Sequence, residues 1–308
     1  MTRSRRAVRG ASGVLGLALL GAALTQGPAT AAPSATTAYC GIGVASVTPG
    51  GDHIFRGITA TTPPTASTTT LGPKNLYPDG KARLAGGLAV TQIPDGLKRR
   101  QYVVLGTDMY LSSYQTKGYT DDVVPGTALL TKVGGGWGSD FRYFEESRYY
   151  SGTTVVRNNA YALQSGQLNR WTITSAGWGS KQVYTGYSAV KTMALISQTK
   201  TYDTFLANTY GGALYTIRIP LSGAPIVTKV RTSTWQGFES LVAADCGTQG
   251  VLLLGVDQDT GAPFLYAVGH ANGTATVING LGRVPRTYAD VAYFRNYGAA
   301  DYDNLFGE

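Results

Sequence analysis

Histidine, cysteine and charged residues are all scarce in this chain. Its 308 residues include two histidines and two cysteines. A Ser/His/Asp catalytic arrangement needs a histidine held by a carboxylate beside an activated serine, and the sequence has no Gly-x-Ser-x-Gly segment. His270 lies just before the turn signal Asn272-Gly273, which favours a turn residue over a base. Two widely spaced histidines and two cysteines give no support for a zinc site, so we expect no metal and no cofactor.

The charge balance gives no reason to expect a nucleic acid partner. The first 31 residues hold four of the 26 basic residues and no acidic ones, so the rest of the chain has 22 basic against 18 acidic residues. A mild excess without a basic stripe does not favour nucleic acid binding. The one dense basic run, Lys98-Arg99-Arg100, is expected at a solvated hairpin tip.

Residues 1–31 are predicted to be a secretory signal peptide. Four arginines precede an apolar run from Ala11 to Leu24, and Ala29-Thr30-Ala31 offers a small-residue cleavage site. The run is shorter than the roughly 20 apolar residues that cross a bilayer, and no second run of that length follows. We therefore expect a secreted, extracellular protein without membrane insertion. Ser4 to Val8 partly resembles a twin-arginine signal, which leaves the export route open.

The two cysteines, Cys40 and Cys246, both lie in the part of the chain expected to be exported. An oxidising compartment makes a disulfide the default expectation, and two free buried thiols are the alternative. On the chain-entropy model, a bridge over this long a loop stabilises the folded state by at most about 5 kcal/mol.

A repeat organises the sequence. Thr131–Trp137 and Thr228–Trp235 both read Thr-Lys-Val, then small or polar residues, then Trp. Their tryptophans are 98 residues apart, twice 49, and a degenerate copy that ends in Tyr, Lys181–Tyr187, lies midway. A period of about 49 residues matches the four-stranded blades of a β-propeller. Low charge, abundant glycine and the lack of long helical patterns also favour an all-β protein.

Four complete blades of four antiparallel strands are predicted between Lys81 and Val284. Each predicted blade has an apolar opening strand and, after a glycine turn, a strand with a Leu-Tyr or similar pair. The pairs are Met109-Tyr110, Ala160-Tyr161, Leu214-Tyr215 and Leu265-Tyr266. The predicted strands of the second blade are Phe141–Glu146, Thr153–Arg157, Ala160–Gln164 and Leu168–Thr174, and the last strand of the fourth is Thr274–Ile278.

The remaining segments fit a split fifth blade. Tyr288–Arg295 and Asp301–Phe306 would supply two strands, and Cys40–Val47 with His53–Ile58 the other two. The sequence thus predicts an all-β, five-bladed β-propeller over residues 32–308, closed by a blade shared between its N- and C-terminal segments. A Cys40–Cys246 disulfide would lock this closure. The Thr/Pro-rich residues 59–80 are expected to form a surface loop within the domain, with an inter-domain linker as the alternative.

On these motifs the chain resembles the tachylectin-type five-bladed propeller lectins. Thr131–Trp137, Thr228–Trp235, Leu214-Tyr215 and Leu265-Tyr266 carry the resemblance, and the shared plan covers nearly all of residues 32–308. The resemblance implies binding of N-acetylated hexosamines at one shallow site per blade. The family usually has a Trp in each blade, whereas only positions 137 and 235 carry it well here. In size and signal style the chain is also similar to propeller lectin subunits of secreted toxin particles.

Candidate ligand-binding residues lie in the segments between blades. An aromatic ring can stack on the apolar face of a sugar while polar neighbours bind its hydroxyls. The alternative is that these aromatics wedge the blades together. The candidates are Trp137 with Asp140, Tyr187 with Lys191, and Trp235 with Gln236 and Glu239.

Non-catalytic recognition of cell-surface or extracellular glycans is the predicted function, because several weak sites on one rigid face gain avidity. An interaction subunit of a secreted complex is the first alternative. A glycoside hydrolase is the second, since opening strands line the channel of a propeller and a carboxylate pair there could be catalytic. The carboxylates in question are Asp140, Glu145, Glu146, Glu239, Asp245 and Asp290.

Overall fold

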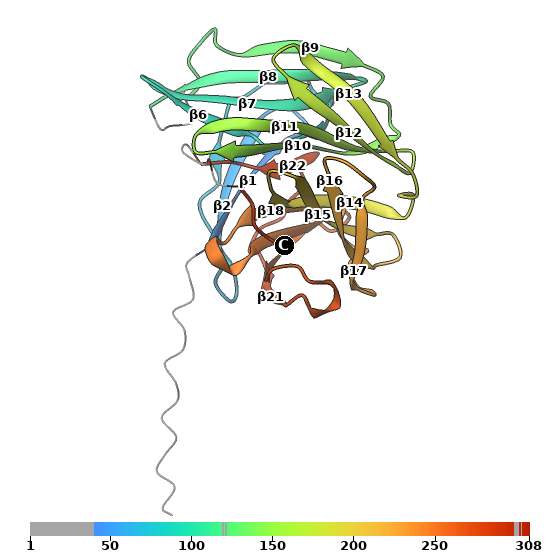
Figure 1. The fold of residues 1–308 in the computed structure, drawn as a ribbon. Helices are drawn as coiled ribbons and strands as arrows, with labels where there is room; N and C mark the ends of the chain where they lie inside the picture. The colour runs from blue at the N-terminus through green and yellow to red at the C-terminus, as the bar shows by residue number, and fades with distance from the viewer. Residues whose placement is uncertain (1–39, 119, 121, 299–301, 303) are drawn as a thin grey trace, which may run out of the picture. The chain divides into compact units, whose positions relative to one another are not determined.

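The computed structural model describes residues 40–118, 120, 122–298, 302 and 304–308. The predicted signal peptide lies outside these residues. The described chain folds into five antiparallel sheets, which we call the first to fifth blades (Figure 1). Its only helices are two short 3-10 turns, η1 (Gly247–Gln249) and η2 (Gly273–Ala275). No helix within the described ranges is long and apolar enough to span a membrane.

The first blade is a meander from the centre outward, with one extra strand beside its second strand. β6 (Ala89–Ile93) pairs with β7 beyond the end of β5. Arg99 and Arg100 lie within β7, so their predicted place at a hairpin tip is wrong. The four main strands are β5 (Ala82–Ala85), β7 (Gly96–Leu105), β8 (Asp108–Lys117) and β9 (Leu129–Gly135).

The second blade differs from its predicted strand pattern. Thr154–Gln164 forms one long strand, β11, where two were expected, and it is paired with β10 from Thr154 to Gln164. The outermost strand is β13, which the sequence pattern missed. The strands are β10 (Phe141–Ser151), β11, β12 (Gln167–Thr174) and β13 (Gly177–Tyr184).

The third and fourth blades follow the predicted order. The exception is the last strand of the fourth blade, which begins at Ile278 and not at Thr274, because η2 occupies the preceding residues. The third blade has β14 (Val190–Gln198), β15 (Tyr202–Thr209), β16 (Leu214–Pro220) and β17 (Ile226–Arg231). The fourth has β18 (Ser240–Asp245), β19 (Val251–Asp257), β20 (Ala262–Val268) and β21 (Ile278–Arg283).

The fifth blade joins the two ends of the described chain and closes the ring, as predicted. β22 (Ala292–Arg295) is its innermost strand and pairs with β1 (Gly41–Val47), placing Val44 opposite Arg295 (Figure 1). β2 (His53–Thr59) follows β1, and the outer edge is formed by the two-residue strands β3 (Thr65–Ala66) and β4 (Thr70–Leu71). The Thr/Pro-rich segment therefore supplies the outer strand positions of this blade.

Among the described residues, one strand of this blade comes from the C-terminal side, which corrects the predicted second strand over 301–306. Asp301 and Asp303 lie outside the described residues. Phe306 instead forms an isolated bridge with Ser197 of the third blade. The Leu305 carbonyl accepts from Gln198 N–H at 2.9 Å, so the segment follows β14 and not β22.

The hydrophobic core lies between blades. The innermost strands contact one another in the cyclic order β5, β10, β14, β18 and β22, and back to β5. One cluster joins Tyr102 and Met109 of the first blade to Phe144 and Ala162 of the second. A Cys40–Cys246 disulfide, with Cα atoms 5.3 Å apart, ties the fifth blade to the fourth as predicted.

Candidate functional site

Five aromatic residues, one per blade connection, occupy equivalent places in the ring. Each follows the outer strand of one blade, and its backbone N–H donates to a carbonyl in the hairpin turn between second and third strands. Trp137 donates to Thr107 at 2.9 Å and Trp235 to Gly212 at 3.0 Å. We call this set the blade-linking aromatics: Tyr77, Trp137, Tyr187, Trp235 and Tyr288.

The blade-linking aromatics are buried, with exposed fractions between 0 % and 7 %. Trp137 lies against Phe141 at a centroid distance of 4.4 Å and against Trp171 at 5.7 Å. Trp235 packs against Tyr266 at 4.8 Å and Phe238 at 5.8 Å. Their rings therefore fill space between neighbouring blades, and little of either face is left for a sugar.

The residue before three of these aromatics adopts a left-handed backbone conformation. Gly136 has φ 84° and Gly186 has φ 93°. At the third site the residue is Thr234, with φ 80°. A β-branched residue in this region is strained, so the chain tolerates a local cost to turn into the fourth blade at Trp235.

The polar candidates beside these aromatics are largely committed to neighbouring groups. Asp140 accepts from Gln164 Nε2 at 2.9 Å and Ser165 Oγ at 3.1 Å, and the Gln164 hydrogen bond lowers its pKa. Glu239 forms an ion pair with Lys191 and accepts from Gln258 N–H at 2.7 Å.

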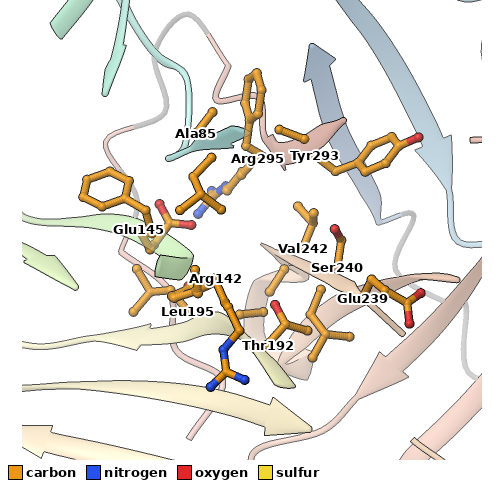
Figure 2. Close-up of a pocket in the computed structure, with 18 of the residues that line it drawn as sticks. Ala85, Arg142, Glu145, Thr192, Leu195, Glu239, Ser240, Val242, Tyr293 and Arg295 are labelled. Atoms are coloured by element: carbon orange, nitrogen blue, oxygen red, sulfur yellow. The ribbon is translucent and has the colours of Figure 1, made fainter. Parts of the chain in front are cut away.

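A cavity of about 220 Å³ lies at the centre of the ring, where the innermost strands of all five blades contribute side chains (Figure 2). Ala85, Leu195 and Val242 form part of its apolar wall. Thr192 and Ser240 add hydroxyl groups. Among the candidate ligand-binding residues, Glu239 is the one that lines this cavity, so the structure does not bring Trp137, Tyr187 and Trp235 together there.

Charged side chains at the start of the innermost strands connect neighbouring blades around the cavity. Arg83 donates to the carbonyls of Trp137 at 2.7 Å and Gly138 at 3.0 Å. Arg142 donates to Tyr210 Oη at 2.6 Å. Together with the Lys191–Glu239 pair, these contacts fasten the first blade to the second, the second to the third, and the third to the fourth.

Glu145, on β10, is the distinctive titratable group of the cavity. Its Oε1 accepts from the backbone N–H of Gly87 and of Glu146, both at 3.0 Å. Burial raises the pKa of Glu145 to about 7 in spite of these donors and the nearby Arg295. Figure 2 shows Glu145 and Glu239 on opposite sides of the cavity, with the Glu239 carboxylate directed away from Glu145.

The other carboxylates on or beside opening strands are held by donors. Arg56 and Ser46 bind Asp290 at 2.8 and 2.6 Å, and Gly247 N–H donates to Asp245 at 2.8 Å. Arg100 and Asn158 bind Glu146. Across the described ranges, no group of three or more His, Cys, Asp or Glu side chains is arranged to hold a metal ion.

The fold and this cavity define a five-bladed β-propeller with a small, mixed polar and apolar pocket at its centre. No protein-family model matches the chain, and no curated protein does.

The solved structures that resemble it in fold include an arabinofuranosidase and two lectins. An alpha-L-arabinofuranosidase of Podospora anserina, in complex with cellotriose, is 13% identical with a TM-score of 0.45, and the match covers 74% of this chain and 79% of that one. The SapL1 lectin in complex with alpha methyl fucoside is 12% identical, with a TM-score of 0.42 and coverage of 78% and 79%. The Aleuria aurantia lectin with Fucalpha1-6GlcNAc is 13% identical, with a TM-score of 0.44 and coverage of 80% and 79%. Likeness at this level concerns the fold alone.

Proposed function

We propose that this protein is a secreted, non-catalytic carbohydrate-binding propeller, and that a terminal sugar unit binds in the central cavity. One observation carries the proposal: all five blades line a concave pocket that combines apolar walls with convergent polar groups. Such a combination is typical of small-molecule sites, in which apolar contacts give affinity and a few polar groups fix orientation.

The size and chemistry of the cavity favour a sugar. Its volume of about 220 Å³ lies below the roughly 300–1,000 Å³ typical of small-molecule sites, which suits one monosaccharide unit better than a chain. Thr192 and Ser240 carry hydroxyls that both donate and accept, and Gln258 adds an amide. Sugar hydroxyls need both kinds of partner.

The carboxylates favour binding over hydrolysis. Glycoside hydrolysis uses a second carboxylate across the scissile bond from the acid. Glu145 has the raised pKa of an acid, but Glu239 across the cavity is occupied by Lys191 and by the backbone N–H of Gln258. The Cys40–Cys246 disulfide supports the proposed oxidising, extracellular location.

A glycan array and a matched pair of variants test this proposal. Thr192→Val removes a cavity hydroxyl with little change in shape, and Thr228→Val makes the same change on the exposed strand β17. We expect the wild type and Thr228→Val to bind the same glycans, and Thr192→Val to bind them at least about tenfold more weakly. An array without any ligand, or equal binding by both variants, would contradict the cavity site. N-acetylated hexosamines belong on the array because the resemblance of the motifs implies them.

A second candidate function is docking to another secreted protein, such as the partner subunits of a toxin particle. Apolar side chains on two outermost strands favour it: Leu129 and Leu130 on β9 are 60% and 41% exposed, and Ile226 and Val227 on β17 are 54% and 51% exposed. Co-purification from culture supernatant tests it. A stable partner that is lost when Leu129→Ser and Ile226→Ser are combined would favour docking over free glycan binding.

A further inference from the structure

A groove between the first and second blades has an unusual lining. It measures about 450 Å³ and lies apart from the central cavity, with which it shares no lining residue. Three arginines line it, Arg100, Arg148 and Arg157, and no Asp or Glu does. The groove therefore presents positive charge on a surface of otherwise mixed composition.

A buried carboxylate behind the groove holds two of the guanidinium groups in place. Glu146 is 4% exposed, and it accepts from Arg100 at 3.2 and 3.3 Å and from Asn158 Nδ2 at 2.8 Å. The Nε of Arg148 lies 3.7 Å from the same carboxylate. Burial opposes the charge of Glu146, but Arg100 and Arg148 outweigh it and lower the pKa of Glu146. One carboxylate faces two arginines, so this cluster keeps a net positive charge.

The charge of the third arginine is already balanced. Arg157 forms an ion pair with the buried carboxylate of Asp203 and donates to the carbonyl of Thr199 at 2.7 Å. Arg148 differs, because within the described part of the chain its terminal guanidinium nitrogens make no hydrogen bond. Its side chain is 13% exposed, at the groove. Arg148 is thus positioned to bind an anion in a planar, two-pronged geometry.

The other walls of the groove suit a sugar ring. Val155 and Val156 are 40% and 56% exposed and offer an apolar surface. Thr174 and Ser175 bring hydroxyl groups, and the Arg100 guanidinium lies over the Tyr102 ring at 5.1 Å. An inorganic anion would contact the arginines but would not contact the apolar surface of the two valines.

We infer that this groove binds an acidic saccharide, whose carboxylate or sulfate group contacts Arg148 and Arg100 while its ring packs on Val155 and Val156. The inference is independent of the proposed ligand of the central cavity. It adds a second site with a different chemical preference, for negatively charged sugars.

Amide NMR titration with three probes tests the inference. Free glucuronate carries both the charge and the ring, glucose only the ring, and inorganic sulfate only the charge. We expect glucuronate to shift the amides of Val155, Val156 and Ser175, glucose to leave them unchanged, and sulfate to bind at least about tenfold more weakly. Higher salt weakens the glucuronate effect, because exposed charges are screened.

Two variants and one control complete the test. Arg148→Gln removes the free guanidinium, and Val156→Glu places a negative charge at the exposed rim without touching the buried cluster. We expect each to weaken glucuronate binding at least about tenfold, whereas Arg283→Gln, on an exposed arginine of β21, leaves it unchanged. The inference would be overturned if glucose or sulfate bound as strongly as glucuronate. It would also be overturned if tens of millimolar glucuronate gave no shift, or if Val156→Glu bound glucuronate as the wild type does.

Discussion

Glu145 accepts a hydrogen bond from the backbone N–H of Gly87 at 3.0 Å, and this contact joins the innermost strand of the second blade to the segment that follows β5. Burial disfavours the charged form of this carboxyl group, and its two N–H donors do not compensate for the burial. Burial accordingly raises its pKa from 4.5 to about 7.

This pKa predicts how stability depends on pH. Between pH 4.5 and 7 the folded protein holds a proton on Glu145 that the unfolded chain has released, so the contribution of Glu145 to the free energy of unfolding falls as pH rises through this window. The loss is on the order of 3 kcal/mol, and it is complete above pH 7. Glu145→Gln keeps an acceptor for Gly87 and should remove this contribution, so the free energy of unfolding of the wild type relative to Glu145→Gln should fall over this window. His53 acts in the opposite direction in both proteins, because burial lowers its pKa to about 3.

Urea unfolding measured from pH 4 to pH 9 checks the Glu145 prediction. Asp259→Asn, on an exposed carboxylate, is the matched control and should retain the wild-type slope. A difference in unfolding free energy between wild type and Glu145→Gln that does not change with pH would contradict the prediction.

Thr234 occupies a place where two of the other blades have glycine, Gly136 and Gly186. Thr234→Gly removes left-handed strain of roughly 1–2 kcal/mol and adds backbone entropy to the unfolded chain, for a net stabilisation of up to about 1 kcal/mol. The reverse change, Gly186→Thr, should destabilise by about 1–2 kcal/mol, although an added Cβ there meets no atom within 4 Å. Thermal and urea unfolding of both variants measure whether each change raises or lowers stability. A Thr234→Gly variant less stable than the wild type would contradict the claim that Thr234 is strained.

Trp235 is expected to act as a wedge between blades. Trp235→Ala should lower the free energy of unfolding by about 3–5 kcal/mol, because it leaves a cavity beside Tyr266 and Phe238. Its exposed neighbour provides the control, since Gln236→Ala should change stability by less than about 0.5 kcal/mol. If Trp235→Ala instead left stability intact and abolished glycan binding, the inter-blade sugar site expected from the sequence would gain support.

Removal of the disulfide should be costly. Replacing Cys40 and Cys246 by serine frees a loop with a sequence separation of 206 residues, which corresponds to about 5 kcal/mol on the chain-entropy model. Equilibrium unfolding of the double variant measures the cost. A loss under about 1 kcal/mol would mean that pairing of β22 with β1 is sufficient to close the ring.

The sequence predicted the fold from its repeats but found only part of the repeated structure. The blade-linking aromatics at Trp137, Tyr187 and Trp235 keep a spacing near 49 residues, so the period revealed them. Tyr77 and Tyr288 have the same N–H contact to a hairpin turn. They were missed because Tyr77 lies 60 residues before Trp137 and Tyr288 lies 53 residues after Trp235, and because neither is a Trp.

The candidate site was harder to predict, for a physical reason. A pattern of aromatic and polar residues gives the order of side chains along the chain but not which ring face is covered, and burial decides whether Trp137 and Trp235 can reach a ligand. Glu145 and Glu146 are adjacent in sequence, yet the pKa of one is raised and that of the other lowered. The two pKa values differ because Arg100 and Arg148 lie beside Glu146, which only the three-dimensional structure shows.

The Cys40–Cys246 bridge also changes what one proteolytic cut can do. Any cut between the two cysteines leaves both pieces in one covalent molecule, and each piece still contributes strands to the ring. We expect a nicked protein to run as one species without reductant and as two with it. Cleavage at an exposed hairpin would thus leave the assembled propeller, and any ligand held at its centre, in place.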